Sequence, residues 1–75
     1  MTHSGGSNVI SNDITVGNDF SWKVDNETGA NIDNLTVSAG KTVTAGNSNY
    51  LEAADKVFVL GIVTPAPTIV EGGNP

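Results

Sequence analysis

The stretch from which the fold is predicted is Leu35-Thr36-Val37-Ser38-Ala39-Gly40-Lys41-Thr42-Val43. Apolar and polar side chains alternate on both sides of Ser38-Ala39-Gly40, which is the period of a half-buried strand. A three-residue loop with Gly at its third position suits a type I turn followed by a bulge, because that position takes the left-handed conformation. We therefore expect a β-hairpin in which Leu35 lies opposite Val43. A register shifted by one residue would send these two side chains to opposite faces.

Further strands are expected on both sides of this hairpin. Phe20–Val24 alternates, with Phe20, Trp22 and Val24 expected to face the core. Val57–Val63 is short, apolar and rich in β-branched residues, which predicts a single strand covered on both faces. A first short strand is expected within 9–16 and a last edge strand over 68–70.

Ser48–Asp55 is the helical candidate. Asn49 suits a helix N-cap, and Glu52 three residues later completes a capping box. Because six or seven residues cannot hold a helix alone, we expect one or two helical turns at a corner of the sheet structure.

Composition supports an all-β fold. Val and Ile, which suit pleated surfaces, far outnumber Leu, and Asn and Gly are the residues of tight turns. No internal repeat of 20 residues or more is recognised. We predict a small antiparallel β-sandwich or barrel with one short helical turn and extended terminal arms. The expected divisions are a flexible N-terminal arm (1–8), a single β domain (9–63) and an extended, Pro-containing C-terminal arm (64–75).

Two segments carry a family resemblance. Phe20–Gly29 followed by Asn34–Val37 resembles the strand–Asn–Gly–strand hairpin of small immunoglobulin-like surface modules, and Leu51–Val59 is similar to the corner before a late strand of such sandwiches. The resemblance implies an immunoglobulin-like character for the fold. It transfers no binding residues.

Charge and length exclude several classes of protein. The 75 residues carry a formal net charge of -5, with three Lys and no Arg, so a cationic nucleic-acid-binding surface is not expected. No apolar stretch approaches the 18 residues of a membrane span, and the first residues lack the pattern of a secretory signal. The Met start without such a signal predicts a complete small gene product.

The strongest candidate ligand site is an acidic turn. Asp25, Glu27, Asn31 and Asp33 offer oxygen atoms of the kind that Ca²⁺ prefers, although their spacing departs from the EF-hand pattern. A solvated β-turn is the favoured interpretation of these four residues, so neither a metal site nor any cofactor is predicted.

Catalytic candidates are weaker. Asp13, Asp19, Asp25 and Asp33 would need a cleft and sugar-binding aromatic residues to act as paired carboxylates in glycoside cleavage. His3 lies in the Gly/Ser-rich arm, where nothing is expected to orient it. We therefore predict that the protein is not an enzyme.

A chain of this size hides only about 60% of its surface on folding, which leaves little margin of stability for a solitary domain. We expect contacts with other protein subunits, in a homo-oligomer or a larger assembly, to complete the fold. The predicted function is structural, most concretely that of a minor, cementing or decorating component of a virus or phage capsid. The expected location is the virion, or otherwise the cell surface or extracellular space. The predicted interface residues are Ile62, Val63, Pro65, Pro67, Ile69 and Val70.

The alternative is an immunoglobulin-like surface module that binds a protein or carbohydrate ligand. In that interpretation Tyr50 is the one aromatic residue expected at an exposed binding patch.

Overall fold

The computed structural model describes residues 2–3, 7–26, 29 and 32–72. These residues form strands only: β1 (Thr2–His3), β2 (Ser7–Ile10), β3 (Ile14–Val16), β4 (Phe20–Val24), β5 (Asn34–Val37), β6 (Thr42–Ala45), β7 (Asn49–Ala53), β8 (Val57–Val59), β9 (Ile62–Thr64) and β10 (Thr68–Glu71). They belong to sheet A (β1-β4-β7-β10), sheet B (β2-β5-β8) and sheet C (β3-β6-β9).

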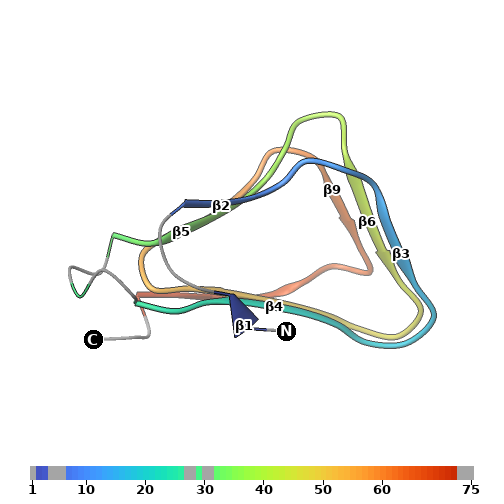
Figure 1. The fold of residues 1–75 in the computed structure, drawn as a ribbon. Helices are drawn as coiled ribbons and strands as arrows, with labels where there is room; N and C mark the ends of the chain where they lie inside the picture. The colour runs from blue at the N-terminus through green and yellow to red at the C-terminus, as the bar shows by residue number, and fades with distance from the viewer. Residues whose placement is uncertain (1, 4–6, 27–28, 30–31, 73–75) are drawn as a thin grey trace.

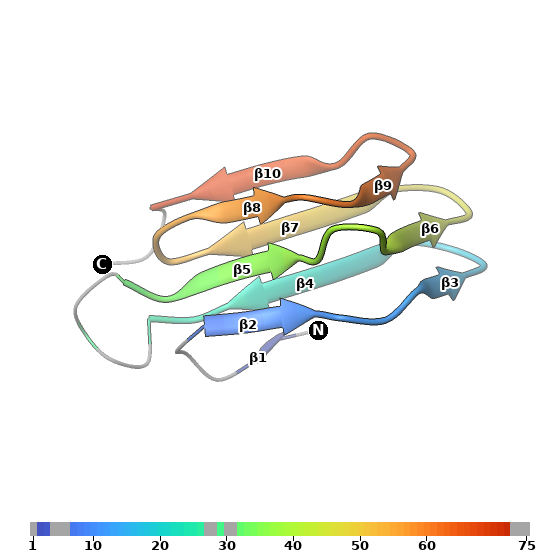
Figure 2. The same ribbon diagram turned by 90° about the horizontal axis from the view of Figure 1, so that it is seen from above.

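The chain winds as a three-sided parallel β-solenoid. It passes through sheets B, C and A in turn, so that β2-β3-β4, β5-β6-β7 and β8-β9-β10 form three successive coils, with β1 added beside β4. Seen along the stack, the three sheets are the sides of a triangle (Figure 1). Seen from above, the coils lie beside one another with their strands aligned (Figure 2).

The predicted antiparallel sandwich or barrel is therefore wrong, and so is its immunoglobulin-like character. Every strand pair in the described part of the chain is parallel. The all-β prediction itself is confirmed, because residue propensity and alternation report strand formation and not the direction of the neighbouring strand.

The predicted hairpin around Gly40 is a corner between two sheets. Gly40 does adopt the left-handed conformation, with φ at 78°, and the Lys41 amide donates a hydrogen bond to the Ser38 carbonyl at 3.2 Å. However, Leu35 lies in sheet B beside Val57, and Val43 lies in sheet C beside Ile14 and Val63. A short loop with a left-handed Gly turns the chain in either setting, so the local pattern does not distinguish a hairpin from a corner.

The predicted helical turn is wrong as well. Asn49–Ala53 forms β7, in the centre of sheet A between β4 and β10. Leu51 and Ala53 are fully buried in the core, while Tyr50 and Glu52 lie on the outer face. Period-2 burial between two neighbouring strands outweighs a local capping signal in a segment too short to hold a helix.

Two stretches that were predicted as single strands each turn a corner. The segment 9–16 contains β2 and β3 in sheets B and C. The apolar run Val57–Val63 contains β8 and β9, joined by a corner at Leu60 and Gly61. Phe58 is 46% exposed, so the run is not covered on both faces as expected.

The core is a stack of apolar columns, each formed by residues that occupy equivalent positions in successive coils. Sheet B contributes Ile10–Val37–Val59, sheet C contributes Ile14–Val43–Val63, and sheet A contributes Trp22–Leu51–Ile69. The residues of the middle coil in these columns, Val37, Val43 and Leu51, are fully buried. The inward orientation predicted for Phe20, Trp22 and Val24 is confirmed.

Polar side chains tie the corners of one coil to the next. Asp13 Oδ1 accepts a hydrogen bond from the Thr42 amide at 2.9 Å, and Asn34 Oδ1 accepts one from the Lys56 amide at 2.9 Å. Asp19 Oδ1 accepts bonds from Asn47 Nδ2 and Ser48 Oγ at 2.7 and 2.8 Å. These contacts keep the corners aligned from coil to coil.

Aligned corners also reveal a repeat that the sequence analysis missed. Ile14–Phe20 and Val43–Asn49 occupy equivalent positions in the first and second coils, 29 residues apart. Both segments contain Gly-Asn at the corner, as Gly17-Asn18 and Gly46-Asn47. The third coil has Pro65-Ala66-Pro67 at this corner, and the spacing between its equivalent strands is shorter, which obscures the period.

Both terminal segments contribute paired strands. β1 pairs with β4 over two residues, Thr2 with Lys23 and His3 with Val24. β10 pairs with β7 over four residues, from Thr68 with Tyr50 to Glu71 with Ala53. The predicted last edge strand is thus present, and it lies along a sheet of its own chain.

Candidate functional site

The main candidate site is the C-terminal end of the solenoid, which we define as β8, β9, β10 and the corner at Leu60 and Gly61. Each of these three strands is the last in its sheet and therefore has a neighbour on one side. Of the six exposed large hydrophobic residues in the described ranges, four lie here: Phe58, Leu60, Ile62 and Ile69, with exposures of 46%, 63%, 60% and 44%. Strand edges combined with apolar side chains favour pairing with another chain.

The predicted interface residues all lie in this last coil. Ile62 and Ile69 are exposed, whereas Val63 packs against the core beneath β9. Pro65 and Pro67 lie at the corner between β9 and β10, where the Pro65 carbonyl accepts a hydrogen bond from Asn49 Nδ2 at 2.8 Å. Val70 is half-buried in β10. Sequence reasoning did not identify Phe58 and Leu60 as interface candidates, because it assigned both to a doubly covered strand.

Glu71 modifies one edge of this end. Its Oε2 accepts a hydrogen bond from the Val57 amide at 2.8 Å. Val57 is the first residue of β8, and its amide is thereby satisfied by a carboxylate instead of by another strand. Glu71 occupies the column of Val24 and Ala53, the two buried residues below it in sheet A. A charge at this position opposes the burial of the end.

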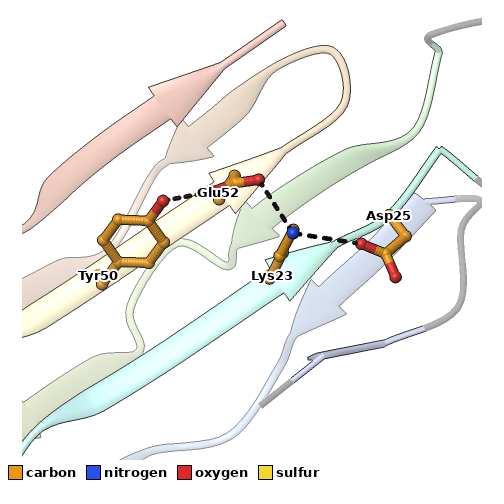
Figure 3. A network of polar contacts seen from close by, with 4 residues as sticks. All are labelled: Lys23, Asp25, Tyr50 and Glu52. Carbon is orange, nitrogen blue, oxygen red and sulfur yellow. Dashed lines mark hydrogen bonds and ion pairs between the residues drawn. The ribbon is translucent and has the colours of Figure 1, made fainter. Parts of the chain in front are cut away.

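A second candidate is a polar network on the outer face of sheet A (Figure 3). The Tyr50 hydroxyl donates a short hydrogen bond to Glu52 Oε1. Lys23 Nζ lies 3.7 Å from Glu52 Oε2 and 3.9 Å from Asp25 Oδ1. The register of β4 and β7 creates the network by placing Lys23 beside Glu52.

Glu52 shapes the acid–base behaviour of Tyr50. The hydrogen bond to Glu52 raises the pKa of Tyr50 above its usual value of 10.0, and desolvation and the negative charge of Glu52 act in the same direction. Tyr50 therefore lies on an outer face, as the alternative function requires, but its hydroxyl is already occupied by Glu52.

The residues predicted for calcium do not come together as a described site. Asp25 lies near Lys23, and Asp33 is fully buried. Glu27 and Asn31 lie outside the described residues. Within the described ranges, no group of three or more His, Cys, Asp or Glu residues is placed to hold a metal ion.

The catalytic candidates are also dispersed. Asp13 and Asp19 bind corner groups of the second coil, on different corners of the triangle. The side chain of His3 lies outside the described part of the structure. No pocket is present among the described residues, and none of their secondary structure is a helix able to cross a membrane.

Comparison with known proteins adds no family assignment: neither a protein-family model nor a curated protein nor a solved structure matches this chain.

Proposed function

We propose that this chain is a non-enzymatic structural protein that assembles with other protein subunits through the C-terminal end of its solenoid. The observation that carries the proposal is the concentration of Phe58, Leu60, Ile62 and Ile69 at the end where all three sheets terminate. Apolar surface beside open strand edges gains most from a protein partner, since that partner supplies both burial and main-chain hydrogen bonds.

In its most specific form, the proposal makes the chain a minor, cementing or decorating component of a virus or phage capsid. Such a component needs a small ordered body and an adhesive surface. The stacked coils supply the first and the C-terminal end supplies the second. This form rests on analogy of physical character and would place the protein in the virion.

The proposal is tested by sedimentation of a tagged chain from its native source. Wild type is expected to travel with a larger protein particle, and Ile62→Lys to be lost from it, because a charge would be buried at the interface. Ile32→Lys is the matched control: Ile32 is 58% exposed, similar to the 60% of Ile62, but lies before β5, away from the C-terminal end.

Circular dichroism of the purified variants checks that each keeps the wild-type β-sheet spectrum. The proposal is overturned if wild type sediments as a free monomer from its source, or if both variants stay with the particle as well as wild type does.

A further inference from the structure

We propose that the C-terminal end receives the N-terminal end of a second copy of this chain, so that copies stack head to tail into a longer solenoid. The inference rests on the proposed function, since it uses the same surface, and it names the partner.

The strand directions permit such a stack. β8 and β9 are the last strands of sheets B and C, and β2 and β3 are the first strands of the same sheets. Because all pairs are parallel, a second copy displaced by three coils would place β2 beside β8 and β3 beside β9 with matching direction. Main-chain groups at both edges would then pair at the usual spacing of about 4.8 Å.

The side-chain columns match across the same junction. In sheet B, the column that ends in Val59 would continue with Ile10 of the second copy. In sheet C, the column that ends in Val63 would continue with Ile14. Both continuations bring apolar side chains together, as in the interior of each copy. The two ends are therefore alike in chemistry as well as in topology.

Sheet A requires one rearrangement. In the stack, β10 of one copy would lie beside β4 of the next, in the place that β1 occupies. β1 pairs with Lys23 and Val24, whereas β10 is long enough to pair with four residues, as it does on β7. In that longer pairing Ile69 would meet Trp22, which extends the third apolar column. β1 is thus a short cover that a longer strand replaces.

Glu71 acts against stacking at the opposite end. Its bond to the Val57 amide occupies a main-chain donor at the start of β8. Stacking would also bring Glu71 beside Val24 of the second copy, in an otherwise apolar column. One removable cover at each end lets the chain exist as a monomer and associate as its concentration rises.

Cysteine cross-linking tests the arrangement. The outer column Val9–Thr36–Phe58 places an exposed residue at each end of sheet B, and the chain contains no Cys of its own. In the stack, Phe58 of one copy lies beside Val9 of the next, within the Cα separation that a disulfide spans. A mixture of Phe58→Cys and Val9→Cys chains is therefore expected to give a covalent dimer on oxidation, which neither variant gives alone.

Thr15→Cys replaces Val9→Cys in the control mixture, because Thr15 lies in sheet C and is equally exposed to solvent. No covalent dimer is expected there. Equal cross-linking in both mixtures, or a dimer of Phe58→Cys with itself, would overturn the head-to-tail arrangement. The latter result would leave the proposed function standing with a different geometry.

Sedimentation velocity of the purified wild-type chain separates the remaining outcomes. Association that grows with concentration and is lost in Ile62→Lys supports stacking. A wild-type chain that stays monomeric at all concentrations, yet travels with a larger particle from its source, overturns the second copy as partner but not the assembly role.

Discussion

Gly46 lies directly over the backbone carbonyl of Gly17: a Cβ atom added at Gly46 would lie 2.0 Å from that oxygen. The two residues occupy the same corner in successive coils, and their close approach sets how tightly the coils stack at that corner. Nothing lies within 4 Å of a Cβ added at Gly17. Gly46 is thus required for steric reasons, whereas Gly17 is not.

Gly46→Ala is expected to lower the free energy of unfolding by about 2–3 kcal/mol, since the backbone of one coil must shift to admit the methyl group. Gly17→Ala, the matched control, should change it by no more than about 0.5 kcal/mol. Urea unfolding of both variants measures the difference. Equal losses would show that the corner does not limit the stacking distance.

Tyr50 is expected to ionise at a higher pH than free tyrosine, because ionisation breaks its bond to Glu52 and places two negative charges together. The chain contains one Tyr, so the ultraviolet absorbance of tyrosinate reports this residue alone. Glu52→Gln should return the pKa toward its usual value. An unchanged titration in that variant would contradict the role of Glu52.

The same bond links stability to pH. Since the pKa of Tyr50 is higher in the folded chain than in the unfolded chain, the stability from this bond is complete below about pH 10. It is lost as the pH rises through the raised pKa. Tyr50→Phe should weaken this alkaline loss, which thermal melts between neutral and strongly alkaline pH would reveal.

Removal of residues 1–6 should strengthen self-association, because it deletes β1 and opens the edge of β4 to β10 of another copy. Sedimentation equilibrium measures the association constant. Weaker association in the shortened chain would instead assign β1 a positive part in the contact.

Glu71→Gln should also strengthen self-association, since a neutral amide is less costly to bury beside Val24 than a carboxylate. Asp55→Asn is the control for the general loss of one negative charge, because Asp55 lies at the corner between β7 and β8. If both variants associate equally more than wild type, the effect belongs to net charge and not to the position of Glu71.

Sequence patterns predicted the strands better than their partners. Alternation in Phe20–Val24 reports which side chains face inward whatever lies next to the strand, so that prediction succeeded. The partner of Leu35 depends on whether Gly40 turns the chain back on itself or around a corner, and a left-handed Gly serves both. The recurrence of Gly-Asn at 17–18 and 46–47 was the available signal for coils, although a single recurrence is faint.

The candidate sites were predictable in part. Ile62 and Ile69 were identified as interface residues from their apolar character near the Pro segment. The network of Tyr50, Glu52 and Lys23 was not predicted, because it arises from a parallel register between residues 29 positions apart. Local analysis assigned Glu52 to a helix cap, a role that applies only within a helix.

The corners at which the chain passes from sheet B to sheet C differ in length: 11–13 in the first coil, 38–41 in the second and 60–61 in the third. The strands on either side nevertheless remain in register. Insertions and deletions at this vertex therefore need not disturb the interior. Over evolutionary time, such a scaffold can acquire new loops, and with them new recognition properties, independently of the residues that hold it together.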